Sequence, residues 1–411
     1  MTTLEILSSL FLIAALFGLI SKRWLKLPLT VGTMLLTVVT SLLLGAVASL
    51  APHLHHWAVA LANDIDFEAI ILHGMLPLLL FAGAFLFDVE ELAKQKLPVT
   101  LLAVVGTLIS IIVVAGLMTL LDGRSLPWIQ CLLFAALISP TDPIAVLEML
   151  RRVGVPSHIQ AQLAGESLFN DGLGAVLFLT VLDYARGESA TPFHVAGFLV
   201  VKAGGGILLG VVAAWVAAHL MRRVDAYQVD ILFTIALALG GYAIADALSV
   251  SAPLEAVVAG ITLNMLNRDQ PAKRVAHRNI AEFWSVIDEV QNSLLFVLLG
   301  LQTMAIAVDG RSFVAGLAAI ASVNTARLVA VAAILGLLRL LRRRADSSLF
   351  VLTWGGLRGG LSIALALSVP EAFGRTWILG ATFVVVVFSV VLQGGSMDWF
   401  LRRSQRKHAT P

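Results

Sequence analysis

The chain has 411 residues, of which 59% are hydrophobic and only 13% are charged, and its formal net charge at pH 7 is +2. Soluble domains usually carry about 25% charged residues, so this composition excludes an ordinary soluble protein. The single Cys131 excludes an intramolecular disulfide and a cysteine-ligated metal site. Apolar stretches of about 20 residues recur along the whole length, each long enough to cross a hydrocarbon core as a helix. The sequence therefore predicts an all-α polytopic membrane protein.

Proline, glycine and charged residues divide the sequence into thirteen candidate transmembrane spans. In chain order these spans cover residues 5–21, 29–50, 69–88, 97–120, 127–149, 163–184, 194–220, 230–249, 252–266, 279–308, 312–338, 347–369 and 376–400. We expect residues 1–400 to form a single membrane unit and residues 401–411 to form a short cytoplasmic tail.

The basic residues orient these spans. The segments that follow odd-numbered spans hold 21 Lys and Arg residues, whereas the segments that follow even-numbered spans hold four. Basic residues gather in cytoplasmic loops of membrane proteins. The N-terminus is therefore expected outside and the C-terminus in the cytoplasm.

Two of the spans are interrupted by helix-breaking residues. The fifth contains ISPTDP at residues 138–143, and the twelfth contains WGGLRGG at residues 354–360. Proline removes a helical hydrogen bond and glycine weakens a helix, so both spans are expected to unwind within the membrane. The two spans cross the membrane in opposite directions, as expected for inverted repeats of spans 1–6 and 8–13 around span 7. Two such discontinuous helices are typical of a transporter with its site at the midplane.

The break in the fifth span has two interpretations. The prolines leave backbone carbonyls near Ser139–Thr141 without helical partners, and beside Asp142 such carbonyls are suitable ligands for a hard cation. Alternatively, the segment is a proline kink in which Asp142 caps the second half-helix. The motif alone leaves both open.

The sixth span carries a polar cluster in its first half, within LAGESLFNDG at residues 163–172. Ser167 and Asp171 stack on one helical stripe, and Glu166 and Asn170 stack on the adjacent stripe. One stripe can offer a hydroxyl and a carboxylate to a cavity while the other makes structural contacts. Asp171 is expected about 12 Å into the membrane, near the middle of a core of about 30 Å.

The buried charges suggest how these groups are paired. Arg358 is always charged and needs a fixed partner, for which the sequence favours Glu166. Asp142 and Asp171 are then left as neighbouring buried carboxylates, which raise each other's proton affinity. Such a carboxylate holds a proton or a small cation, but not both strongly. This competition is sufficient for antiport once access to the site alternates.

Three motifs, SPTDPIAV, GESLFNDG and WGGLRGGLSIALALSVP, occur in this order, and QNSLLFVLLGLQ lies in the tenth span. Together they resemble the bacterial sodium/proton antiporters of the monovalent cation:proton antiporter-1 family, relatives of the eukaryotic sodium/hydrogen exchangers. The resemblance covers nearly the whole chain. It implies an inverted-repeat fold with two crossing unwound helices, a homodimer in membrane lipid, and elevator-like alternating access. We accordingly expect the inner (plasma) membrane of a bacterium, no cofactor besides the transported ions, and no nucleic-acid partner.

The resemblance also implies roles for individual residues. Asp171 is the implied ion- and proton-binding carboxylate, and it shares the transported monovalent cation with Asp142. Asn170, which precedes it, is also implied to belong to the ion- and proton-binding site. Thr141 and Ser167 complete the implied site. Glu166 and Arg358 form the implied structural ion pair. Arg327, beside Asn324, is an implied supporting arginine.

The Asn170–Asp171 pair bears on stoichiometry. Relatives with two aspartates at these places form the electrogenic branch, whereas the Asn-Asp pair resembles the electroneutral branch. A site that holds either one proton or one monovalent cation moves no net charge per cycle. We expect electroneutral Na⁺/H⁺ exchange, with K⁺ or Li⁺ as alternative cations. In one departure, this chain reads Phe81-Ala82-Gly83 where many relatives carry an acidic residue in the third span.

Two other function classes fit the sequence less well. A cation channel usually needs a continuous pore, whereas two broken helices in one chain favour alternating access. An intramembrane enzyme needs a nucleophile with its base or a metal triad, but Cys131 stands alone and no H-E-x-x-H spacing occurs, so we expect no enzyme. Asp288 and Glu289, near the start of the tenth span, form either a funnel that attracts cations or a solvated helix end.

Overall fold

The computed structural model describes residues 3–25, 29–46, 69–121, 126–142, 144–187, 192–224, 226–268, 274–305, 310–341, 348–397 and 400. Within these ranges every regular element is a helix and no β-strand occurs, which confirms the predicted all-α fold. Seven helical segments in the same ranges are long and apolar enough to cross a membrane, and shorter apolar helices accompany them. The predicted spans coincide with helices or pairs of helices, but their number of thirteen stays a prediction. Pro143 and the expected tail 401–411 lie outside the described residues.

The helices have the following bounds. The N-terminal half folds into α1 (Thr3–Ile20), η1 (Ser21–Leu25), α2 (Leu29–Ala46), η2 (Ala69–Met75), α4 (Leu76–Phe85), α5 (Val89–Lys94), α6 (Lys96–Thr100), η3 (Leu101–Gly106), α7 (Thr107–Leu121), α8 (Trp128–Ile138), α9 (Ile144–Val153) and α10 (Ser157–Ala185). The C-terminal half folds into α11 (Pro192–Met221), α12 (Tyr227–Ala247), α13 (Ala252–Arg268), α14 (Arg274–Ala305), α15 (Gly310–Leu340), α16 (Leu349–Trp354), α17 (Gly360–Leu367), η5 (Glu371–Phe373), α18 (Arg375–Phe388) and η6 (Ser389–Gly394).

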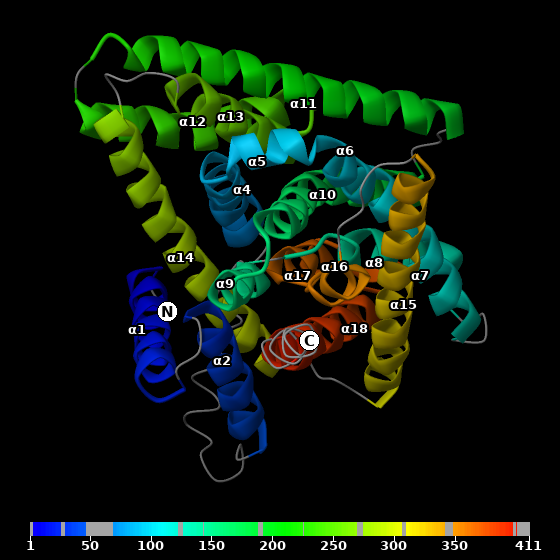
Figure 1. The fold of residues 1–411 in the computed structure, drawn as a ribbon. Helices are drawn as coiled ribbons and strands as arrows, with labels where there is room; N and C mark the ends of the chain where they lie inside the picture. Colours follow the sequence, from blue (N-terminus) through cyan, green and yellow to red (C-terminus); the bar gives the residue numbers. More distant parts are fainter. Residues whose placement is uncertain are drawn as a thin grey trace, which may run out of the picture.

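These helices form two groups, which Figure 1 shows side by side. In the first group α11, α12 and α13 form a layer along one edge, α4 packs against α13, and α14 runs from this layer toward α1 and α2. In the second group α7, α8, α10, α15, α17 and α18 pack around one another. We name the first group the scaffold and the second the core. α10 belongs to the core and also packs against α4 and α13, so it lies at the boundary between the two groups.

The predicted breaks in the fifth and twelfth spans are confirmed. The fifth span is divided into α8 and α9 because Pro140 removes a helical hydrogen bond. The twelfth is divided into α16 and α17, which are separated by the glycine-rich stretch 355–359. Ser348 caps the start of α16, where its hydroxyl accepts a hydrogen bond from the backbone N–H of Val351 at 3.3 Å.

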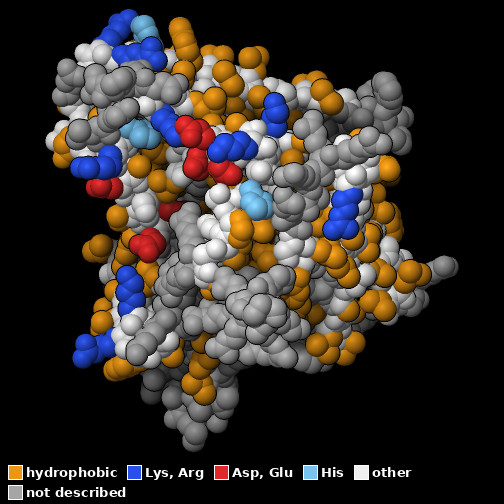
Figure 2. Space-filling model, viewed as in Figure 1, with side chains coloured by type: hydrophobic (Ala, Val, Ile, Leu, Met, Phe, Trp, Pro, Cys, Tyr) orange, Lys and Arg blue, Asp and Glu red, His pale blue; other side chains and the backbone are white. Residues whose placement is uncertain are grey.

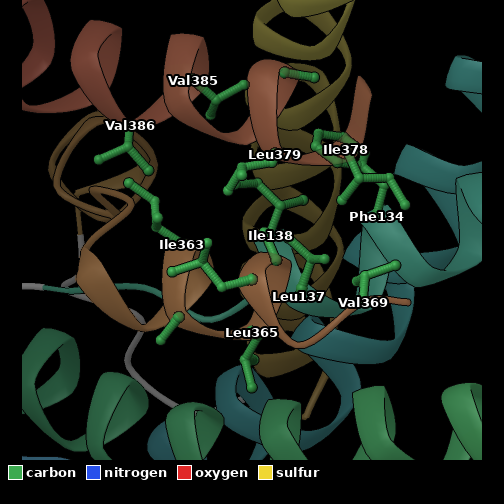
Figure 3. Packing of buried hydrophobic residues seen from close by; sticks show 14 of the residues in the cluster. Phe134, Leu137, Ile138, Ile363, Leu365, Val369, Ile378, Leu379, Val385 and Val386 are labelled. Carbon is green, nitrogen blue, oxygen red and sulfur yellow. The ribbon is translucent and has the colours of Figure 1, made fainter. Parts of the chain in front are cut away.

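One apolar cluster fixes the half-helices in place (Figure 3). It joins α8, α17 and α18, whose buried side chains include Phe134, Leu137, Ile138, Ile363, Leu365, Ile378, Leu379, Val385 and Val386. Close packing of such side chains holds helices together inside a membrane, so α8 and α17 are held where each of them meets its unwound stretch. The unwound stretches between them are consequently held at fixed places inside the core.

Candidate functional site

The two unwound stretches contact each other through backbone groups. The N–H of Asp142 donates a hydrogen bond to the carbonyl of Leu357 at 2.8 Å. The guanidinium of Arg358 donates from Nη1 to the carbonyl of Pro140 at 2.8 Å and also to the carbonyl of Ser139. Backbone groups freed by a helix break must find partners inside a membrane. Arg358 provides a donor for the carbonyls that the prolines leave without helical partners.

The ion pair of Glu166 differs from the predicted one. Glu166 pairs with Arg327 of α15 and not with Arg358. Both carboxylate oxygens accept hydrogen bonds from the guanidinium, which also donates to the carbonyl of Leu352 from Nε at 3.1 Å and from Nη2 at 2.8 Å. The prediction of a Glu166–Arg358 pair is therefore wrong. The physical reason is that Arg358 is engaged by backbone carbonyls, whereas α15 brings a second buried arginine to α10.

Thr141 of the unwound stretch is fixed by two residues of α10. Asn170 accepts a hydrogen bond from the N–H of Thr141 at 3.2 Å and donates one to its hydroxyl at 2.9 Å. Ser167 donates from its hydroxyl to the carbonyl of Thr141. Asn170 is only 1% exposed and does not line the cavity described below. The structure therefore places Asn170 as a partner of Thr141, and its predicted contact with the ion is not supported by this position.

The remaining predicted residues meet at one cavity. A cavity of about 680 Å³ reaches into the core and is lined by Asp171 and Asp142 together with Thr141 and Ser167. The charged groups that act electrostatically on Asp171 are Asp142 and Arg358. The two helical stripes of α10 thus divide as predicted: Ser167 and Asp171 face the cavity, while the other stripe makes structural contacts. Two carboxylates, a hydroxyl and unwound backbone form a set of oxygen ligands that suits a hard cation.

Acidic residues form a rim along part of the cavity. Asp288 and Glu289 of α14 line it, and Glu289 is exposed. Asp288 accepts a hydrogen bond from Asn292 at 3.2 Å and acts electrostatically on Asp142. Of the two sequence interpretations, the funnel therefore fits better than the solvated helix end. The field of such a rim concentrates cations at its mouth.

Two further acidic residues complete the rim at α5. Asp88 caps this helix and lies 3.7 Å from Arg268 of α13, and Glu91 pairs with Lys94 at 3.0 Å. Figure 2 shows the acidic side chains grouped on this face with basic ones beside them. These pairs reduce the charge that α5 adds to the rim, so α14 contributes most of it.

The third span adds no charge to the cavity. Gly83 lines it, whereas Phe81 and Ala82 are fully buried and point elsewhere. The ring of Phe81 lies 4.8 Å from that of Trp284 on α14, so this position packs the scaffold together. The departure noted in the sequence is thus an apolar contact in the structure.

Glycine is required at two places in the unwound stretch of the twelfth span, one facing the other unwound stretch and one facing α15. A Cβ atom at position 359 would lie 2.4 Å from a carboxylate oxygen of Asp142, and one at position 356 would lie 2.6 Å from Nε of Arg327. We call the place where the unwound stretches 139–142 and 355–359 meet the crossing. Neither neighbour can move freely, because Asp142 is hydrogen-bonded in the crossing and Arg327 is held by Glu166. Only residues without a side chain fit here.

Replacement of Gly359 by alanine is expected to disrupt the crossing and to abolish ion exchange. The added methyl group must displace the Asp142 carboxylate from the cavity. Replacement of Gly336 by alanine is the matched control, because nothing lies within 4 Å of a Cβ atom there on α15. Exchange in vesicles is the measurement, and full activity of Gly359→Ala would contradict the geometry described here.

Two comparisons with known proteins decide the family. Residues 11–403 match the family described as sodium/hydrogen exchanger, transmembrane. The chain is 38% identical over 409 residues to the Na(+)/H(+) antiporter NhaP of Pseudomonas aeruginosa, which covers 97% of this chain and 96% of that protein. This chain belongs to the sodium/hydrogen exchanger family.

Further similarities agree with membership of the sodium/hydrogen exchanger family. The chain is 35% identical over 343 residues to the Na(+)/H(+) antiporter NhaH of Halobacillus dabanensis, covering 82% of this chain and 83% of that protein. The structure of the sodium proton antiporter MjNhaP1 from Methanocaldococcus jannaschii has a TM-score of 0.75 over 98% of this chain and 99% of that chain, at 20% identity. The similarity to the MjNhaP1 structure shows a shared fold. The chain is thus a multi-pass membrane protein of a transporter family.

Proposed function

We propose that this exchanger is an electroneutral Na⁺/H⁺ antiporter in which a sodium ion and a proton compete for Asp171. The observation that carries the proposal is the position of Asp171 and Asp142 in one cavity beside unwound backbone. Two relatives named Na(+)/H(+) antiporters, which match 97% and 82% of the chain, support sodium as the cation. K⁺ or Li⁺ is the alternative cation, exchanged by the same mechanism.

The binding step needs only residues of this chain. The sodium ion is coordinated by the carboxylates of Asp171 and Asp142, with Ser167 and Thr141 completing the site. Asn170 holds Thr141 in place. When the ion leaves, a proton takes its place on Asp171, because each of two neighbouring carboxylates disfavours the charged form of the other. No cofactor and no enzymatic step are required.

Each loaded state carries the same charge. A sodium ion and a proton each add one positive charge to the site, so neither half of the cycle moves more charge than the other. Arg358 contributes a constant positive charge at the crossing, where it is bound to the carbonyls of Ser139 and Pro140. One-for-one exchange is therefore electrically silent.

Alternating access is proposed to arise from movement of the core against the scaffold. The spans are arranged as inverted repeats around span 7, and the protein is a homodimer in the inner membrane of a bacterium, with lipid around it. By the distribution of basic residues the N-terminus lies outside and the C-terminus lies in the cytoplasm. The cavity opens beside α5 and the start of α10, which follow spans 3 and 5. It therefore faces the cytoplasm.

Transport by purified protein in liposomes tests the proposal. With a pH gradient across the membrane, addition of NaCl is expected to dissipate the gradient, whereas choline chloride has no effect. Addition of KCl or LiCl in parallel identifies the cation. A pH gradient that persists with all three salts would overturn the proposed function.

The rate at fixed ion gradients is expected to be the same at zero and at an imposed membrane potential. The reason is that one monovalent cation replaces one proton at one site. Potassium and valinomycin set the potential in the same liposomes, and a pH-sensitive dye reports the rate when sodium is the substrate. A clear dependence of the rate on potential would contradict one-for-one stoichiometry.

A further inference from the structure

Three neutral side chains form a hydrogen-bonded chain behind the crossing. Gln393 donates from Nε2 to Oδ1 of Asn324 on α15 at 2.7 Å. Its Oε1 accepts a hydrogen bond from the hydroxyl of Ser389 at 2.7 Å. The same hydroxyl oxygen accepts a hydrogen bond from the backbone N–H of Arg358 at 2.9 Å. We call Asn324, Gln393 and Ser389 the amide relay.

Each group of the relay has its direction fixed by its neighbour. The amide nitrogen of Asn324 donates to the carbonyl of Ile320 at 2.8 Å, which leaves its oxygen for Gln393. Gln393 then presents its own oxygen to Ser389, whose proton is used in that bond. The lone pairs of Ser389 are left to face the N–H of Arg358. The relay ends on that single backbone group.

Two residues of the relay are buried and Asn324 is half-buried, so their polar groups need partners to offset the loss of water. Ser389 is 1% exposed and Gln393 is 4% exposed. A buried polar network that is only partly satisfied is costly, whereas a complete one fixes a unique geometry. Here the described bonds run without a gap from α15 to the unwound stretch.

The N–H of Arg358 lies where the unwound chain provides no helical acceptor, since α16 ends at Trp354 and α17 begins at Gly360. The position of the Arg358 backbone determines two contacts between the unwound stretches. The guanidinium of the same residue donates to the carbonyls before Thr141, and the preceding carbonyl, that of Leu357, accepts from the N–H of Asp142 at 2.8 Å. A shift of this backbone therefore moves the groups beside Asp171.

We propose that Asn324, Gln393 and Ser389 are positioning residues that hold the Arg358 backbone so that Asp142 and Thr141 keep their places at the ion site. None of the three lines the cavity, so they act through Arg358 and do not contact the ion. The inference rests on the proposed ion site and assigns this role to residues outside it.

The test compares Ser389→Ala with the wild-type protein in liposomes. The apparent KM for sodium is expected to rise about fivefold, because a hydrogen bond between neutral groups contributes about 1 kcal/mol. The maximal rate is expected to change less than the KM. Ser389→Thr keeps the hydroxyl and is expected to restore the KM.

Replacement of Gln393 tests whether the relay acts as a unit. Gln393→Leu is expected to raise the KM about as much as Ser389→Ala, and the double variant is expected to be no worse than either single variant. Ser322→Ala is the matched control: its hydroxyl is fully buried on α15 and donates only to the carbonyl of Ala318 within its own helix. Additive effects, or an equal rise of the KM in Ser322→Ala, would overturn the proposal.

Hydrogen–deuterium exchange of residues 355–360 in detergent gives a readout that does not depend on transport. Faster exchange there in Ser389→Ala, with the rest of the core unchanged, supports the relay. Unchanged exchange overturns it, whatever the transport assay gives. Faster exchange with an unchanged KM also overturns it, because the relay then holds the stretch without positioning the site. If the wild-type protein does not exchange sodium for protons in liposomes, the proposed function is overturned instead.

Discussion

Replacement of Asp171 by asparagine is expected to abolish sodium-dependent proton movement in everted vesicles. The amide has nearly the shape of the carboxylate, but it neither takes up a proton at neutral pH nor offers a negative charge to the cation. Both halves of the proposed cycle are lost at once. The rate is therefore expected to fall to the background of vesicles that lack the protein.

The matched control for this variant is Asp183→Asn on the same helix. Asp183 lies toward the other end of α10, where it is 3.7 Å from Lys202 and 3.9 Å from Arg186. It does not line the cavity, so the variant is expected to keep its activity. If both variants are present in the membrane in comparable amounts, the loss of activity in Asp171→Asn results from the lost carboxylate and not from a lack of protein. Substantial exchange by Asp171→Asn would remove that residue from the mechanism.

Replacement of Glu166 by alanine is expected to produce the largest loss of stability. It leaves the guanidinium of Arg327 buried without its carboxylate, and breaking a buried ion pair in this way costs about 3–5 kcal/mol. The side chains of Arg327 and Glu166 are 5% and 1% exposed, so water cannot take the place of the carboxylate. The temperature of unfolding in detergent is the measurement.

Two further variants test whether the loss of stability comes from the unpaired Arg327 charge. Removing both charges in Glu166→Gln/Arg327→Met is expected to recover part of the stability, because no lone buried charge remains. Glu282→Ala breaks the surface pair of Arg278 and Glu282, which are 72% and 71% exposed, and is expected to change the unfolding temperature little. If Glu166→Ala melted at the wild-type temperature, the Arg327 pair could not be what joins α10 to α15.

The arrangement along α10 could be predicted because it depends on one helix alone. Residues four apart share a face of a helix, so Ser167 and Asp171 were expected to face one way and Glu166 and Asn170 another. The structure confirms that division. The breaks at Pro140 and around Gly356 followed from equally local rules. The roles of these residues in ion binding stay predictions.

The partners between helices could not be predicted in the same way. Arg327 and Arg358 are both buried, and nothing in their local sequence tells which of them reaches Glu166. That choice depends on where the fold places α15 relative to α10 and on where the carbonyls of the fifth span point. The proline break was the better signal for the partner of Arg358. It frees backbone carbonyls, and these carbonyls need hydrogen-bond donors as much as Glu166 does.

The amide relay gave no sequence signal at all. Ser389 and Gln393 are single polar residues in an apolar span, and their spacing of four is that of a common local contact. Their significance depends on Arg358 and Asn324, which come from other parts of the chain. Only the packed core brings these groups together.

Proton release from purified protein tests the central claim most directly. The claim is that a sodium ion and a proton share the carboxylate of Asp171 in turn. Addition of NaCl to the protein in weakly buffered detergent is expected to acidify the solution by about one proton per binding site. Choline chloride, and NaCl added to Asp171→Asn, are expected to cause no change. No acidification by any alkali cation, or equal acidification by the Asp171→Asn variant, would contradict the account.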